Sequence, residues 1–206
     1  MTLRLESEGT VARLLIDRAA KRNAFDQAMW AALPGLVAEA VASPAARVMV
    51  LQAADEGAFC AGADIAELMA NKDDAAWRAA NHAAIGKAQS MLARAAKPTI
   101  AFIDGDCVGG GCGLAMACDI RVATPRARFG ITPAKLGLVY PLHDTKLLVD
   151  LVGPGQAIAV HRRADRRRRG TGDRAGRTDR AAGLARRPAL WRAAQRDEAR
   201  GGGRTA

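Results

Sequence analysis

Disulfide and metal-ligand patterns are missing from this sequence. Its four cysteines show no C-x-x-C pairing, and three of them lie in or beside glycine-rich turns. We interpret them as small buried thiols rather than as disulfide partners or metal ligands. The three histidines, His82, His143 and His161, lack the spacing of a metal site. We therefore expect no metal centre.

Long apolar runs are also missing. No segment stays apolar over the roughly 20 residues that a membrane-spanning helix needs. The N-terminus has neither the charged nor the apolar region of a signal peptide. We expect a soluble, cytoplasmic protein without a membrane partner, and its 206 residues suffice for one domain with a hydrophobic core.

Charge is distributed unevenly, and lysine disappears from the last quarter of the chain. Residues 1–156 contain 16 basic and 16 acidic residues, whereas residues 157–206 contain 15 arginines, no lysine and 5 acids. The net charge of +10 therefore belongs to the second segment alone. We divide the chain into a core, residues 1–156, and an arginine-rich tail, residues 157–206.

The tail lacks a sustained apolar face, which a packed helix requires. We hypothesise that the reading frame shifts near Ala157, because GC-rich DNA read out of frame encodes mainly Arg, Ala, Gly and Pro. A genuine disordered basic tail is the alternative. Such a tail would bind nucleic acid without sequence preference. Trp191 is its only aromatic residue, so base stacking has no support and we do not expect a nucleic-acid partner.

Apolar periodicity in the core predicts strands that alternate with helices, and hence an α/β protein. The predicted strands cover residues 3–8, 11–17, 47–52, 99–103 and 120–123. The predicted helices cover residues 26–42, 64–69, 73 or 74 to 95, 110–117 and 141–151. Asp26 and Asp64 are expected to cap their helices, and Pro34 with Gly35 to disturb the first one.

Two glycine-rich turns each lead into a helix. Residues 102–120 read FIDGDCVGGGCGLAMACDI, and residues 59–68 read FCAGADIAEL. Glycine lets a ligand lie directly on the backbone. The first amides of a helix have no partner within it and carry partial positive charge. The two turns are therefore suited to binding an oxyanion.

These turns, together with RAAKRNAF at residues 18–25 and ARFGITPAKLGL at residues 127–138, resemble the enoyl-CoA hydratase/isomerase (crotonase) superfamily. The resemblance covers residues 3–156. It implies a superhelix of repeated ββα units, an acyl-CoA thioester substrate, no cofactor beyond the CoA of that substrate, and a homotrimer or hexamer. In such a family member the tail region would hold further ββα elements and helices that build the trimer.

The resemblance also implies a site. The amides of Ala63 and Gly110 would form an oxyanion hole for the thioester oxygen. CoA would lie along residues 21–24 and 61–65, mainly against main-chain atoms. Lys21 or Arg22 would meet a CoA phosphate, unless they form a solvated basic turn. Asp64 is expected to cap a helix, and Asp119 to act structurally at a strand end. The CoA-binding residues implied are Lys21, Arg22, Ala24, Ala61, Asp64 and Ile65.

Two departures from the family pattern limit the chemistry. Hydratases of the family carry glutamates at the positions of Gly113 and Pro133. Adding water to an enoyl thioester requires groups that activate the water and deliver a proton, and neither residue can do this. We therefore do not expect ordinary hydratase activity.

The segment TPAKLGLVYPLHD resembles the methylmalonyl-CoA decarboxylase branch, in which a tyrosine stands at the position of Tyr140. Decarboxylation needs an oxyanion hole and little acid–base machinery. The match is partial, because that branch has a histidine in place of Ala63. Tyr140 is the leading candidate for proton delivery, with a core position as the alternative, whereas His143 and Asp144 are expected at a helix start or on the surface. Decarboxylase- or isomerase-like chemistry and an inactive CoA-binding remnant both remain open.

Overall fold

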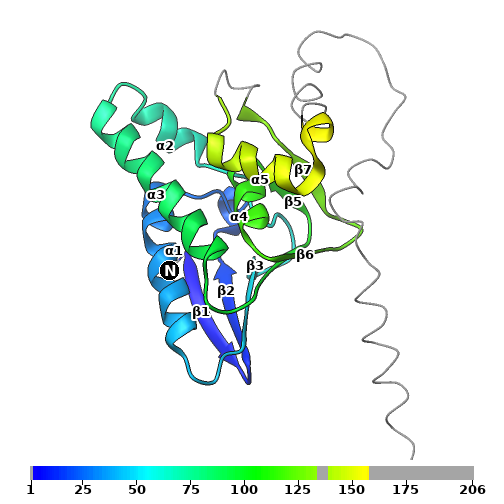
Figure 1. Ribbon diagram of the computed structural model, residues 1–206. Helices are drawn as coiled ribbons and strands as arrows, with labels where there is room; N and C mark the ends of the chain where they lie inside the picture. The colour runs from blue at the N-terminus through cyan, green and yellow to red at the C-terminus, as the bar shows by residue number, and fades with distance from the viewer. Residues whose placement is uncertain (1, 134–138, 158–206) are drawn as a thin grey trace, which may run out of the picture.

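The computed structural model describes residues 2–133 and 139–157. The predictions for the tail beyond Ala157 lie outside these residues. The described chain forms a five-stranded sheet, a small two-stranded sheet and the helices that cover them (Figure 1). Its elements are β1 (Leu3–Glu8), β2 (Val11–Ile16), η1 (Ala19–Lys21), α1 (Gln27–Ala42), β3 (Val48–Ala53), α2 (Ile65–Ala70), α3 (Ala75–Ala93), β4 (Thr99–Ile103), β5 (Asp106–Val108), α4 (Gly110–Ala117), β6 (Ile120–Ala123), β7 (Arg128–Gly130) and α5 (Leu142–Val152).

The element order repeats a ββα unit, as β1-β2-α1, β4-β5-α4 and β6-β7-α5. The large sheet has the order β1-β2-β3-β4-β6, in which β1 and β2 are antiparallel and the remaining pairs are parallel. Strands β5 and β7 pair in parallel as a separate ribbon. The predicted α/β class and ββα repeat are confirmed. Strands β5 and β7 were not predicted, since three-residue strands carry too little pattern to detect.

Buried apolar rows join the sheet to its helices. Leu14 pairs with Leu51, which in turn pairs with Ala101, and all three are at most 2% exposed. Helices α1 and α3 pack against each other beside the sheet, and α4 contacts both α3 and α5 (Figure 1). This arrangement places α4 between α3 and α5, with the turn that carries Gly62 against its N-terminus.

Helix α1 begins as predicted, because the Asp26 carboxylate accepts a hydrogen bond of 2.8 Å from the Met29 amide. The expectation that Pro34 disturbs this helix is wrong, since α1 is continuous through it to Ala42. Pro34 forgoes a backbone hydrogen bond. The neighbouring side chains of Leu33 and Val37 are fully buried, and this apolar face holds the helix against the core.

A structural role for Asp119 is also confirmed. Its carboxylate accepts hydrogen bonds from the amide and the hydroxyl of Thr99, at 2.8 and 2.9 Å. These bonds join the end of α4 to the first residue of β4. No helix within the described ranges is long and apolar enough to cross a membrane.

Candidate active site

The two glycine-rich turns meet at the N-terminus of α4. Gly62 has a φ of +96°, and a Cβ atom added there would lie 2.9 Å from the Val108 carbonyl oxygen and 3.3 Å from the Gly110 nitrogen. A Cβ on Gly110 would lie 3.2 Å from the Trp30 ring. Glycine is therefore needed at position 62 both for its φ and for the close approach of the two backbones.

The N–H of Ala63 points away from Phe25, the residue with which Ala63 pairs. Phe25 donates to the Gly62 carbonyl at 2.7 Å and accepts from the Asp64 amide at 2.8 Å, forming a short parallel bridge opposite Ala63. Alternation along a paired strand directs the N–H of Ala63 to the opposite side. Gly110 is the first residue of α4, so its amide has no acceptor within the helix.

Neither amide donates a hydrogen bond to another residue of the described ranges. Both residues are half-buried, and the residues on either side of each are buried. Two backbone donors without partners in residues 2–133 and 139–157 therefore lie on adjoining turns, and one of them carries the partial positive charge of a helix N-terminus.

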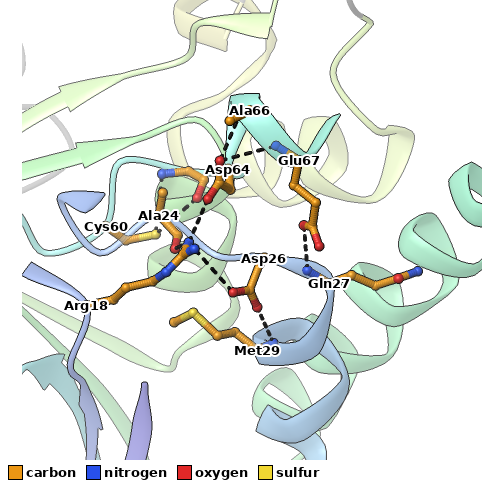
Figure 2. Close-up of polar contacts among 10 residues, drawn as sticks. Arg18, Ala24, Asp26, Gln27, Met29, Cys60, Asp64, Ala66 and Glu67 are labelled. Carbon is orange, nitrogen blue, oxygen red and sulfur yellow. Dashed lines mark hydrogen bonds and ion pairs between the residues drawn. The ribbon is translucent and has the colours of Figure 1, made fainter. Parts of the chain in front are cut away.

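Arg18 holds the first turn in place (Figure 2). Its guanidinium donates to the Ala24 carbonyl at 2.8 Å and forms ion pairs with Asp64 at 2.9 Å and Asp26 at 3.4 Å. These contacts join the segment before α1 to the start of α2. The sequence analysis assigned no role to Arg18, although its place at the head of RAAKRNAF and the presence of two capping aspartates were available signals.

Asp64 caps α2, as predicted. Its carboxylate accepts from the amides of Ala66 and Glu67 at 3.0 and 3.4 Å. Burial alone would raise the pKa of Asp64, but the Glu67 amide and the Arg18 guanidinium outweigh it, so the pKa is lowered. Glu67 in turn accepts from the Gln27 amide at 2.9 Å, which ties α2 to α1 (Figure 2).

The residues predicted to contact CoA lie on two adjacent loops. The Ala61 amide donates to the Arg22 carbonyl at 3.0 Å, which joins residues 21–24 to residues 61–65. Lys21 is exposed, and Arg22 forms an ion pair with Asp106. Ala24 is buried, whereas Ile65 is 45% exposed at the start of α2.

Gly113 lies one helical turn after Gly110, and the space beside it is filled by polar side chains. A Cβ atom at Gly113 would lie 2.2 Å from Nε2 of Gln89 and 3.0 and 3.2 Å from the two carboxylate oxygens of Asp144. Gln89 comes from α3 and Asp144 from α5, and each is 1% exposed. The volume that a side chain at position 113 would enter therefore already holds an amide and a carboxylate.

The expected capping or surface position of Asp144 is wrong. Asp144 lies in the first turn of α5 but caps no amide of that helix, and it shares a buried face with Leu148, four residues further on. His143 is exposed, as predicted. In α5, Asp144 faces the protein interior and His143 faces solvent. Local sequence alone does not decide which of the two is buried.

Burial raises the pKa of Asp144 to about 6, against the opposing effect of the Gln89 and Tyr140 polar groups. The Tyr140 side chain is buried, and its hydroxyl donates to the Gly109 carbonyl at 3.2 Å. Tyr140 thus belongs to the core and also contacts the turn that leads into α4. Burial and the nearby Asp144 charge raise the pKa of Tyr140, which keeps its hydroxyl protonated.

All four cysteines are free and buried, as predicted. Burial raises the pKa of Cys60 and of Cys118 to about 12, so these thiols stay protonated.

Pro133 stands where the second family glutamate is expected and offers no titratable group. Residues 134–138, which follow it, lie outside the described chain.

The repeated ββα units and the two joined turns define an α/β protein of the crotonase fold. The chain belongs to the enoyl-CoA hydratase/isomerase family, whose model matches residues 6–174. The resemblance found in the sequence is confirmed. The family match also extends past residue 156, the end of the resemblance predicted from the sequence.

Characterised relatives and solved structures agree with this assignment. The chain is 36% identical over 154 residues to a crotonyl-CoA hydratase of Syntrophomonas wolfei and 35% identical over 154 residues to a short-chain-enoyl-CoA hydratase of Clostridium acetobutylicum. Each match covers 74% of this chain and 58% of the relative. A crystal structure of an enoyl-CoA hydratase/isomerase family protein from Hyphomonas neptunium is 44% identical, with a TM-score of 0.75, over 78% of this chain and 61% of that one. The chain thus spans less than two thirds of the length of these proteins.

Proposed function

We propose that this chain binds an acyl-CoA thioester and stabilises its enolate with the backbone amides of Ala63 and Gly110. The observation that carries the proposal is a pair of backbone donors, on two joined turns, that have no acceptor within the described part of the chain. Donors fixed where negative charge develops contribute about 3 kcal/mol each in comparable sites. The rigid support of the Ala63 turn by Arg18 and Asp64 favours such fixed positions.

The CoA moiety would lie along residues 21–24 and 61–65. These loops are adjacent, and their backbone is held by the Ala61–Arg22 hydrogen bond and the Arg18–Ala24 hydrogen bond. Lys21 and Arg22 present cationic side chains at the exposed end, which suits the phosphates of CoA. Asp64 would support this segment through its cap rather than contact the ligand.

The reaction is expected to differ from hydration. Gly113 and Pro133 supply no acid or base, so we propose decarboxylase- or isomerase-like chemistry that depends on the enolate. Tyr140 supports the decarboxylase reading, because its hydroxyl bonds to the carbonyl just before Gly110. An inactive protein that still binds CoA is the competing function.

Binding and activity assays on the purified protein distinguish the active enzyme from the inactive CoA-binding protein. Calorimetric titration with butyryl-CoA measures binding, and separate assays follow hydration of crotonyl-CoA and release of CO₂ from methylmalonyl-CoA. We expect binding, slow hydration and turnover in the second assay. Fast hydration of crotonyl-CoA would contradict the inference from Gly113 and Pro133, and binding without turnover or proton exchange would favour the inactive protein.

A pair of variants isolates the Gly110 amide. Gly110→Ala keeps the N–H and adds a methyl group, whereas Gly110→Pro also removes the N–H at the first position of a helix, where proline is tolerated. We expect the proline variant to lose about 100-fold more activity than the alanine variant. Equal losses would show that the amide has no catalytic part.

The oligomeric state stays a prediction. The family resemblance implies a homotrimer or hexamer, and Ile120 and Val122 present apolar side chains on β6 that an intersubunit contact would cover. Sedimentation velocity of the full chain distinguishes a monomer from these assemblies.

A further inference from the structure

We propose that Asp144 is the proton-transferring carboxylate of this site, acting from α5 in the space that the family's glutamate would enter from position 113. This inference rests on the proposed binding of an acyl-CoA thioester. The carboxylate oxygens lie 3.0 and 3.2 Å from where a Cβ of residue 113 would stand. A carboxylate is therefore present at this position although the residue that usually carries it is glycine.

The position relative to the two free amides follows from helix geometry. Gly113 is three residues after Gly110, so both lie on one face of α4, about 4.5 Å apart along its axis. The carboxylate beside Gly113 is thus one helical turn from the amide expected to hold the thioester oxygen. An acyl chain whose carbonyl meets Gly110 would extend its α-carbon within reach of this turn.

The Asp144 carboxylate is buried and incompletely paired among the described residues. It is 1% exposed, forms no ion pair with a described residue, and its Oδ1 has no hydrogen-bond partner among those residues. Gln89 and Tyr140 act on the carboxylate as hydrogen-bond donors, but no cation balances its charge among the described residues. A buried carboxylate with one oxygen left unpaired is costly to keep, which points to a functional use.

Among residues 2–133 and 139–157, three groups face Asp144. Gln89 approaches from α3, the Gly113 backbone from α4 and Tyr140 from the segment before α5. None of them is a cation, so burial dominates and brings the pKa of Asp144 to about 6. Both the carboxylate and the carboxylic acid are then available near neutral pH, which a group that alternately accepts and returns a proton requires.

The step balances without a further reactant. The Asp144 carboxylate accepts a proton from the α-carbon of the thioester, and the electrons of that C–H bond form the carbon–carbon double bond of the enolate. The carbonyl electron pair moves to oxygen, where the amides of Ala63 and Gly110 stabilise it. The carboxylic acid returns the proton in the reverse step. Tyr140, which bonds to the Gly109 carbonyl, is a positioning residue for the turn.

Exchange of α-protons with solvent tests the proposal directly. The full chain is incubated with butyryl-CoA in D₂O, and mass spectrometry follows deuterium entering the acyl group, while calorimetry measures binding. Asp144→Asn keeps the shape and removes the base, and Asp150→Asn changes an exposed carboxylate of the same helix that pairs with Lys146. We expect Asp144→Asn to exchange at least about 100-fold more slowly with unchanged binding, and Asp150→Asn to match the wild type.

The pH profile of the wild type provides a second measurement that needs no variant. Exchange should rise as pH increases through about 6, where Asp144 ionises. A flat profile between pH 5 and 8, or Asp144→Asn exchanging at the wild-type rate, would overturn the role of Asp144. Binding without exchange in the wild type would also overturn it, but would leave CoA binding intact. Absence of butyryl-CoA binding would instead refute the proposed function itself, and this inference with it.

Discussion

The guanidinium of Arg18 lies 2.9 Å from the carboxylate of Asp64, and the two side chains are only 19% and 9% exposed. This ion pair connects two segments that are more than forty residues apart in the chain and that carry the predicted CoA-binding backbone. Because both charges are largely removed from solvent, each depends on the other for compensation. The position of the Ala63 amide thus depends on a side chain that does not itself approach a substrate.

Replacing Arg18 by methionine is expected to destabilise the protein by about 3 kcal/mol, because Asp64 would stay buried without its partner. Urea unfolding measures the change, and Arg18→Lys, which keeps the charge but loses the bond to Ala24 or Asp26, should lie between wild type and Arg18→Met. The pKa of Asp64 is lowered on folding, so its contribution to stability is present above pH 3.8 and lost as pH falls through the lower folded value. A difference between wild type and Arg18→Met that stayed constant below pH 3.8 would contradict this assignment.

Asp144 should act on stability in the opposite direction. Its pKa rises from 3.8 to about 6 on folding, so the folded protein binds the proton more tightly and loses stability as pH rises from 3.8 through 6. The loss is about 3 kcal/mol at pH 8. Asp144→Asn removes this titration. In urea unfolding, the free energy of unfolding of the variant relative to the wild type should therefore increase between pH 4 and pH 8. Parallel pH dependence in the two proteins would show that folding does not raise the pKa of Asp144.

Gly113→Ala should be destabilising, because the new methyl group would lie 2.2 Å from Nε2 of Gln89. Overpacking of this kind costs about 1–3 kcal/mol. The double variant Gly113→Ala with Gln89→Ala should lose less than the sum of the two single changes, since the clash is removed. Gly35→Ala in α1 is the control: nothing lies within 4 Å of its added Cβ, and we expect it to be neutral or stabilising.

Gly113→Glu alone should not create a hydratase. The glutamate would compete with Gln89 and Asp144 for one space, and Pro133 would still supply no second acid. Steady-state hydration of crotonyl-CoA by this variant should therefore stay at the wild-type level. A large increase would show that the space is more adaptable than its burial indicates.

The proposed change of reading frame near Ala157 is tested by sequencing the gene across codons 150–206 and translating all three frames. We expect another frame to continue with amphipathic helices, since the printed one supplies arginine without lysine and no apolar face. Function would then be measured on the repaired chain. If no frame encodes such helices, the arginine-rich tail is genuine, and its effect on nucleic-acid binding is measured by removing it.

The sequence by itself determined the features that depend on neighbouring residues. The caps at Asp26 and Asp64, the glycine turns and the order of strands and helices follow from local hydrogen bonds and apolar periodicity, and the motifs identified the family. The ends of the elements shifted by one or two residues, because fraying and the last turn of a helix are weakly encoded.

The tertiary structure alone decided which side chains meet. Arg18 reaches Asp64 across two segments, and Asp144 from α5 reaches the space beside Gly113 of α4, because the folded chain brings three helices together there. In each contact the partner comes from a distant stretch of sequence, so local pattern does not identify which residues meet. Whether the aspartate or the histidine before it faces inward depends on which face of α5 packs against α4, and that is settled by long-range burial rather than by local pattern.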